Sequence, residues 1–144
     1  MKKTINLSTM AAICLFIVLF MAFNAVNAQS LTIKGNVTLE NKSTLEKYKV
    51  QVLDMDLNEC IEFDAFKTFT HKLVYDHSYM VIISRNGFQS KSVYFNTECT
   101  LNKDCKYVFN CNLEPDDVHD NVVCQAGGVF FDKKDKEFTY YYHK

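Results

Sequence analysis

The strongest constraint on the fold is a two-residue alternation of apolar and polar side chains between residues 31 and 113. Leu31, Ile33 and Val37 alternate with polar neighbours, and the same period returns at residues 48–52 and 107–113. Successive side chains of a strand point to opposite faces, so this period predicts strands with one buried face. No segment carries a convincing helical stripe. The chain is therefore expected to be all-β.

Turn signals divide this region into about seven strands. Asp and Asn residues gather at 54–59, a second turn is predicted at 76–78, and Asn86-Gly87 is a strong tight-turn dipeptide. Residues 79–83 are apolar on both sides, which indicates either a central strand or an edge covered by another segment. Turns every 8–12 residues are typical of an antiparallel β-sandwich. We expect that fold over residues 29–113.

The remainder of the chain changes character twice. Residues 114–127 contain the only proline, Pro115, together with four acids, and are predicted to be a linker. Residues 128–144 carry two aromatic arms around a charged turn at 133–136, the pattern of a β-hairpin. An isolated hairpin is marginally stable in water, so this one is expected to dock on the sandwich or on a partner.

Residues 1–28 have the three parts of a secretion signal. Lys2 and Lys3 give a positive start, residues 11–23 are almost entirely apolar, and small residues precede Gln29. The apolar run is shorter than the ~20 residues needed to span a bilayer, so no membrane span is expected after cleavage. An uncleaved anchor and a lipoprotein modified at Cys14 are the alternatives. The prediction is export to the periplasm, the outer membrane or the medium.

The size and charge of the mature chain exclude some partners. Cleavage would leave 116 residues, enough for one domain. Loss of Lys2 and Lys3 leaves 14 basic against 17 acidic residues, a net charge of −3. Nucleic-acid binders usually show a basic excess, and anionic membrane surfaces attract basic segments. Neither partner is expected.

Several segments resemble the carboxypeptidase regulatory-like domains, which are transthyretin-like β-sandwiches. These segments are LTIKGNVT (31–38), YKVQVLD (48–54), YMVIISRNGF (79–88) and KSVYF (91–95). The closing GVFFDKKDKEF (128–138) is similar to a tail on short exported members from Bacteroidetes-type bacteria. The chain departs from the family at residues 42–45, which lack its usual Gly-x-Pro-Leu turn, and in its five mature cysteines. The resemblance implies a non-catalytic module that spaces or presents other domains, or binds a protein or glycan.

An exported protein meets an oxidising compartment, where cysteines pair. The mature chain has an odd number of cysteines, so at least one thiol is free or joins another chain. Cys99 and Cys105 flank a short loop and are one predicted disulfide; Cys60 and Cys124 are a second candidate pair. Cys111 lies on the predicted inward face, where a buried free thiol is expected.

No catalytic residue, metal ligand or cofactor is nominated. Asp54, Asp56 and Asn58 resemble the start of a calcium loop, but the later ligand positions do not match, and a solvated turn is the preferred interpretation. The hairpin aromatics are the predicted partner surface, because exposed tyrosines suit protein or glycan contacts; its residues are Phe130, Phe138, Tyr140 and Tyr142. Packing of one hairpin face on the sandwich is the competing interpretation.

The predicted function is an exported, non-enzymatic binding module of the cell envelope. A purely structural accessory subunit is the first alternative. A small periplasmic hydrolase or metal-dependent enzyme is the second, and it belongs to a different functional class.

Overall fold

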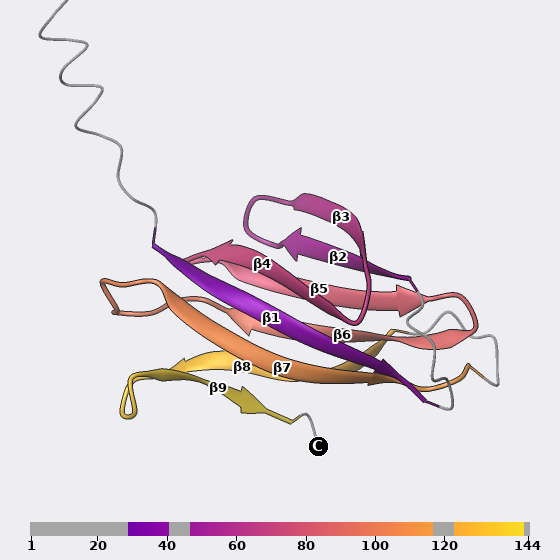
Figure 1. The fold of residues 1–144 in the computed structure, drawn as a ribbon. Coiled ribbons are helices and arrows are strands. Elements are labelled where there is room, and N and C mark those ends of the chain that lie inside the picture. Colours follow the sequence, from indigo (N-terminus) through magenta and orange to yellow (C-terminus); the bar gives the residue numbers. More distant parts are fainter. Residues whose placement is uncertain (1–28, 41–46, 117–122, 143–144) are drawn as a thin grey trace, which may run out of the picture.

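The computed structural model describes residues 29–40, 47–116 and 123–142 (Figure 1). These residues form strands and turns without a helix, so the all-β expectation is confirmed. The predicted signal peptide, residues 1–28, lies outside the described residues. The strands are β1 (Ser30–Leu39), β2 (Tyr48–Asp54), β3 (Glu59–Ala65), β4 (Thr68–Val74), β5 (Ser78–Arg85), β6 (Phe88–Asn96), β7 (Cys105–Leu113), β8 (Cys124–Asp132) and β9 (Glu137–Tyr141).

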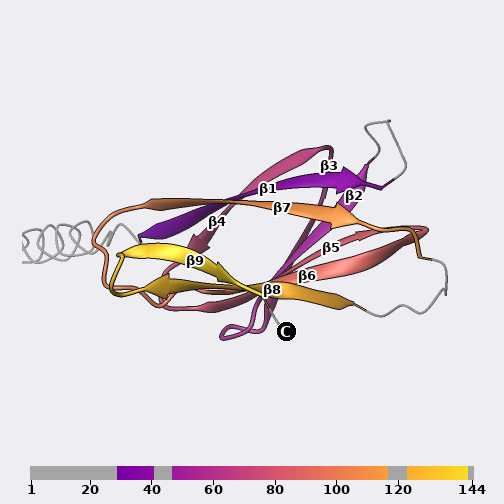
Figure 2. The ribbon, with the colours of Figure 1, turned by 90° about the horizontal axis from the view of Figure 1, so that it is seen from below.

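Two sheets pack face to face (Figure 2). The smaller sheet has the order β4-β1-β7, and the larger has the order β3-β2-β5-β6-β8-β9. Inward-facing residues of both sheets form one apolar core, including the fully buried Leu31, Val50, Val81, Phe95 and Leu113. The predicted sandwich of seven strands followed by a hairpin is therefore confirmed, with β1–β7 as the seven and β8–β9 as the hairpin.

The pairing is mixed, where an antiparallel sandwich was predicted. β1 pairs in parallel with β7, and β6 pairs in parallel with β8. Both parallel pairs join strands that are separated by a long stretch of chain. Between β6 and β8 the chain crosses to the small sheet to form β7 and then returns, which sets β8 in the same direction as β6 (Figure 1). A tight turn between consecutive strands makes them antiparallel, whereas parallel strands need a longer crossover connection. The crossovers are therefore the reason that the pairing is mixed and not wholly antiparallel.

The predicted turns lie where the sequence placed them. Residues 55–58 connect β2 to β3, and Asn86-Gly87 connects β5 to β6, with Gly87 at a φ of 79°. A positive φ at this position is readily adopted by glycine, which has no Cβ. β5 lies between β2 and β6, so of the two alternatives left open for the apolar segment 79–83, the central strand is correct.

The C-terminal hairpin is part of the larger sheet. β8 begins at Cys124, inside the segment predicted to be a linker, and pairs with β6 from Lys91↔Cys124 onward. The register shifts by one residue near Gly127, whose φ is 155°. Residues 117–122 of the predicted linker lie outside the described residues. The hairpin is thus attached by backbone pairing as well as by side-chain packing.

Thr97 fixes the turn between β4 and β5. Its side chain is fully buried, and its hydroxyl lies 2.8 Å from the carbonyl oxygens of Val74 and His77. The same hydroxyl accepts the backbone N–H of His77 at 3.1 Å. A buried hydroxyl with these partners is satisfied, and it holds the backbone of His77 in place.

None of the described residues lies in a helix long and apolar enough to cross a membrane.

Candidate functional site

The predicted partner surface does not form one patch. Neighbouring residues of β8 and β9 face opposite sides of the sheet, because side chains alternate along a strand. Phe138 is buried, with its ring 6.1 Å from that of Tyr75 and 5.4 Å from that of Phe131. Phe130 lies on the outer side, 5.6 Å from Tyr94 between ring centroids. Packing therefore accounts for Phe138, and the predicted set is split between two faces.

Tyr140 and Tyr142 instead border a groove between the two sheets. Their rings are perpendicular, with centroids 4.8 Å apart. The groove encloses about 510 Å³. One wall is β7 over residues 107–112, and the other is formed by residues 124–126 of β8 together with the two tyrosines.

Both walls of the groove present strand edges without a neighbour in the described part of the chain. β7 pairs with β1 along one edge only. Residues 124–126 of β8 precede the first pair of β8 with β9, which is Gly128↔Tyr141. An unpaired strand edge carries N–H and C=O groups that can pair with another chain. The groove is therefore chemically suited to an extended polypeptide.

Aromatic hydroxyls gather at the same place. Burial raises the pKa of Tyr107, and the neighbouring Tyr142 raises it further. Burial, followed by Tyr142 and Tyr107, also raises the pKa of Tyr140. The raised pKa keeps the phenols of Tyr107 and Tyr140 neutral at physiological pH, so both can donate and accept hydrogen bonds.

The walls of the groove differ in charge from the β3 edge of the larger sheet. At that edge, β3 carries Glu62 and Asp64, which form ion pairs with Lys49 and Lys47 at 2.7 Å each. Charges along an edge strand discourage pairing with another chain. Along β7 the exposed residues from 108 to 112 are Val108, Asn110 and Asn112, none of which is charged.

The structure brings together one of the two predicted cysteine pairs. Cys99 and Cys105 both lie beside the Tyr75 hydroxyl, which donates to the Lys103 carbonyl oxygen at 2.9 Å. Cys60 and Cys124 lie on β3 and β8, with β2, β5 and β6 between them. Four strand spacings of about 4.8 Å separate these strands by roughly 19 Å, far beyond disulfide reach. The Cys60–Cys124 pairing is therefore incompatible with this fold.

The predicted buried thiol is Cys111. It is buried on the inward face of β7, and burial raises its pKa to about 11. A thiol held in its neutral form is a poor nucleophile. Cys111 thus acts as an apolar side chain, as its position in the strand alternation predicted.

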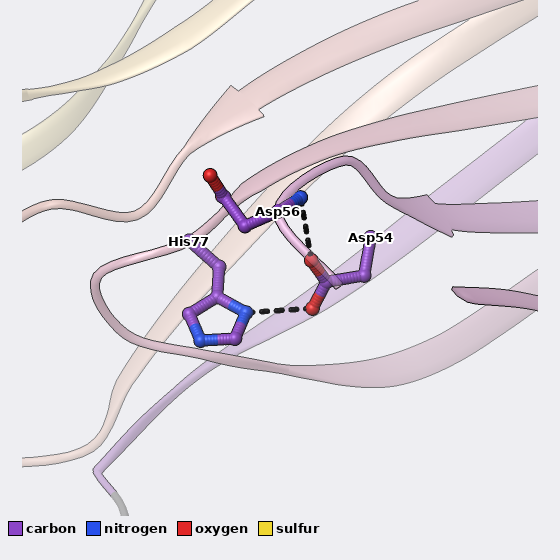
Figure 3. A group of neighbouring side chains, drawn as sticks. All are labelled: Asp54, Asp56 and His77. Carbon is purple, nitrogen blue, oxygen red and sulfur yellow. Dashed lines mark hydrogen bonds and ion pairs between the residues drawn. The ribbon is translucent and has the colours of Figure 1, made fainter. Parts of the chain in front are cut away.

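A cluster of two carboxylates and one imidazole lies at the end of β2 (Figure 3). Asp54 Oδ1 accepts the backbone N–H groups of Asp56 and Leu57 at 3.0 Å each, which stabilises the turn between β2 and β3. Asp54 Oδ2 lies 2.6 Å from Nδ1 of His77, which belongs to the turn between β4 and β5. Asp56 Oδ2 accepts the backbone N–H of Ser78 at 2.5 Å.

The electrostatics of this cluster follow from those contacts. Partial burial opposes ionisation of Asp54, but hydrogen bonds from His77 and from the Leu57 and Asp56 amides outweigh it and lower its pKa. Tyr79 stacks on the His77 ring at 5.9 Å, and burial together with Asp54 raises the Tyr79 pKa to about 12. Asp54 therefore remains a carboxylate at neutral pH.

Sequence reasoning found only part of either site. The turn at 54–59 was predicted, but nothing linked it to His77, which is 23 residues away along the chain. Asn58 lies in the turn with a φ of 55° and is not a member of the cluster. The alternation at residues 107–113 put Tyr107 on the inward face. No local signal indicated that β7 would have a pairing strand along only one edge in the described structure.

Comparisons with known proteins give only distant structural similarity. No protein family and no curated protein matches the chain. The solved structure of S.CueP is 11% identical, with a TM-score of 0.43, over 61% of this chain and 64% of that one. Catechol 1,2-dioxygenase from Pseudomonas arvilla C-1 is 9% identical, with a TM-score of 0.44, over 68% of this chain and 56% of that one. Each match thus covers less than two thirds of the length of the other protein.

Proposed function

We propose that this chain is an exported, non-enzymatic β-sandwich module of the cell envelope that binds an extended segment of a protein partner. In this proposal the segment lies in the groove and pairs with the free edge of β7. The observation that carries it is the pair of strand edges, residues 107–112 and 124–126, that face each other across one groove and have no pairing neighbour within residues 29–40, 47–116 and 123–142. Addition of a strand to an exposed edge is a common mode of peptide recognition.

Export and family membership are parts of the same proposal. The signal-like residues 1–28 support export, and the Asn86-Gly87 turn between β5 and β6 supports a relation to the carboxypeptidase regulatory-like domains. A module of that kind contributes binding or spacing rather than catalysis.

A glycan is the second candidate ligand, and one observation favours it. Tyr107, Tyr140 and Tyr142 border the groove near the amides of Asn110, Asn112 and Gln125. Tyrosine rings pack against sugar faces, and amides bond hydroxyl groups. A glycan would use these side chains and would not need the β7 backbone, which makes the two ligands experimentally separable.

The test is crosslinking in intact cells of the native host, followed by purification of the protein and mass spectrometry of what is bound. The diagnostic variant is Val108→Lys, which places a charge on the free β7 edge at a residue that is 57% exposed. The matched control is Ile61→Lys on the β3 edge, where the native side chain is 53% exposed. Circular dichroism checks that both variants are folded.

Strand pairing predicts that wild type and Ile61→Lys recover the same protein, and that Val108→Lys recovers at least tenfold less of it. Equal recovery by both lysine variants, or no reproducible partner, would contradict the proposal. Binding to a glycan array that is lost in Tyr142→Ala and kept in Val108→Lys would identify the glycan instead. A partner retained by all of these variants would point to an accessory subunit held through another surface.

A further inference from the structure

A second site is formed by Asp54, Asp56 and His77, outside the groove. It lies beside β2 and β5 of the larger sheet, whereas the groove lies beside β8. Asp54 and Asp56 belong to the turn that follows β2, and His77 belongs to the turn that precedes β5. One ligand atom from each of the three side chains lies within 4.8 Å of the others. Ligand atoms about 2.0–2.2 Å from one tetrahedrally coordinated ion lie about 3.3–3.6 Å from one another, so side-chain movements of roughly 1–1.5 Å would let the three surround an ion.

Backbone amides hold the two carboxylates in place while leaving oxygens available. Asp54 uses Oδ1 for the turn amides and directs Oδ2 at His77. Asp56 uses Oδ2 for the Ser78 amide, which leaves its Oδ1 without a hydrogen bond in the described structure. His77 is in turn fixed through the Thr97 hydroxyl. Metal ligands that are already held in place in this way lose little conformational entropy when they bind an ion.

An adjoining cavity gives an ion access to the cluster and adds negative charge. The cavity encloses about 450 Å³ and is bordered by Asp56 and His77 together with Asp76, Ser78, Asn96 and Glu98. No lysine or arginine is among these lining residues. Among the described residues, Lys47, Lys49 and Lys91 form ion pairs with other carboxylates, which are Asp64, Glu62 and Glu114. Carboxylates gathered without a neutralising basic side chain attract a cation.

The geometry points to a binding site for a divalent first-row transition ion, of which Zn²⁺ is the reference, with Asp54, Asp56 and His77 as ligands. The imidazole decides the class of ion, because Ca²⁺ and Mg²⁺ take oxygen ligands whereas Zn²⁺, Ni²⁺ and Cu²⁺ accept nitrogen and oxygen together. The ion would replace the proton between His77 Nδ1 and Asp54 Oδ2, and the ring proton would then reside on Nε2. Three protein ligands leave a fourth position for water.

The test measures binding of ZnCl₂ to the purified protein by isothermal titration calorimetry, after alkylation of accessible thiols. Alkylation is needed because free cysteines also bind zinc. Two variants remove ligands while keeping similar shape, His77→Gln and Asp56→Asn; the latter retains a carbonyl oxygen for the Ser78 amide. The matched control is His71→Gln, which alters a half-buried histidine on β4 that stacks on Phe63.

Wild type and His71→Gln are expected to bind one zinc ion with equal affinity, and each ligand variant should bind at least tenfold more weakly. The thermal midpoint should rise with zinc in wild type and rise less in the ligand variants. Three results would overturn the assignment: no zinc binding, equal affinity in His77→Gln and wild type, or equal affinity for Ca²⁺ and Zn²⁺. Because all of these readouts are independent of the groove, they do not depend on the proposed function.

Discussion

The ring of Phe69 lies directly over Gly35, its register partner across the β1–β4 pair. A Cβ built on Gly35 would lie 2.2 Å from the nearest ring carbon. Phe69 is buried and also meets Phe109, with centroids 5.9 Å apart, so the ring has little room to move. The glycine is therefore required by the packing of its neighbour.

Gly35→Ala should lower the free energy of unfolding by about 1–3 kcal/mol, because overpacking forces side chains or backbone to shift. Urea denaturation measures the change. Lys34→Ala, at an exposed position on the same strand, should change stability by less than about 0.5 kcal/mol. Phe69→Leu should lower the free energy of unfolding less when Gly35→Ala is already present than it does in the wild type, because the smaller side chain relieves the clash. If the losses from the two changes are strictly additive, the steric explanation is contradicted.

Phe95→Ala should be among the most damaging single changes. Phe95 is fully buried between the sheets and contacts Tyr107 and Phe109. Removal of a buried phenyl ring costs about 3–5 kcal/mol through lost burial and the cavity left behind. The control is Phe66→Ala, because Phe66 is 58% exposed and should be nearly neutral. Similar unfolding midpoints for the two variants would show that the core does not depend on Phe95.

The Asp54 carboxylate should contribute stability that depends on pH. Its pKa is lowered in the folded state, so the contribution is fully present above the unfolded value near 4 and is lost as pH falls through the folded value. Asp54→Asn should cost about 1–2 kcal/mol at pH 6, because charge-assisted hydrogen bonds become neutral ones. The difference from wild type, measured in urea, should disappear near pH 2. A constant difference across this range would mean that the carboxylate charge is not responsible.

Thiol labelling should separate Cys60 from Cys111. Cys60 is exposed on β3, whereas Cys111 is buried with a pKa raised to about 11. At pH 8 only about one Cys111 in a thousand would be a thiolate, and that one is shielded. Iodoacetamide followed by peptide mass spectrometry should modify Cys60 within minutes and Cys111 only after unfolding in urea. Rapid modification of native Cys111 would place it at the surface.

The Cys99–Cys105 disulfide stays a prediction that peptide mapping can check. Both sulfurs lie beside the Tyr75 hydroxyl, so an oxidising compartment would find them already close. Protein isolated without reductant should yield a linked peptide pair that separates after reduction. Recovery of both residues as free thiols from the native compartment would argue against the pairing, and Cys60 paired with Cys124 within one chain would argue against the fold.

Much of the local structure could be predicted from the sequence because its signals are local. The alternation in residues 107–113 predicted which side chains of β7 face inward, and the structure buries Phe109, Cys111 and Leu113. The Asn86-Gly87 pair predicted a turn because glycine readily adopts a positive φ. The start of β8 was misplaced, because residues 124–127 lead directly into the glycine pair Gly127-Gly128, which resembles a linker.

Neither candidate site could be assembled from such signals. Asp54 and His77 meet because Thr97 and the packing of β2 beside β5 bring two turns together. The groove lies where β7 and the start of β8, each paired along one edge, have no strand neighbour along the other edge among the described residues.

The sequence by itself thus determined most of the strands and turns, and the inward face of strands such as β7, since these depend on residues only a few positions apart. Only the tertiary structure decided that β1 and β7 run parallel, that Cys60 lies far from Cys124, and that one imidazole meets two carboxylates. The physical reason is that pairing between distant strands is selected by burial of the whole core at once. The choice of pairing partners depends on all the strands together, so it cannot be predicted from any short segment of the sequence.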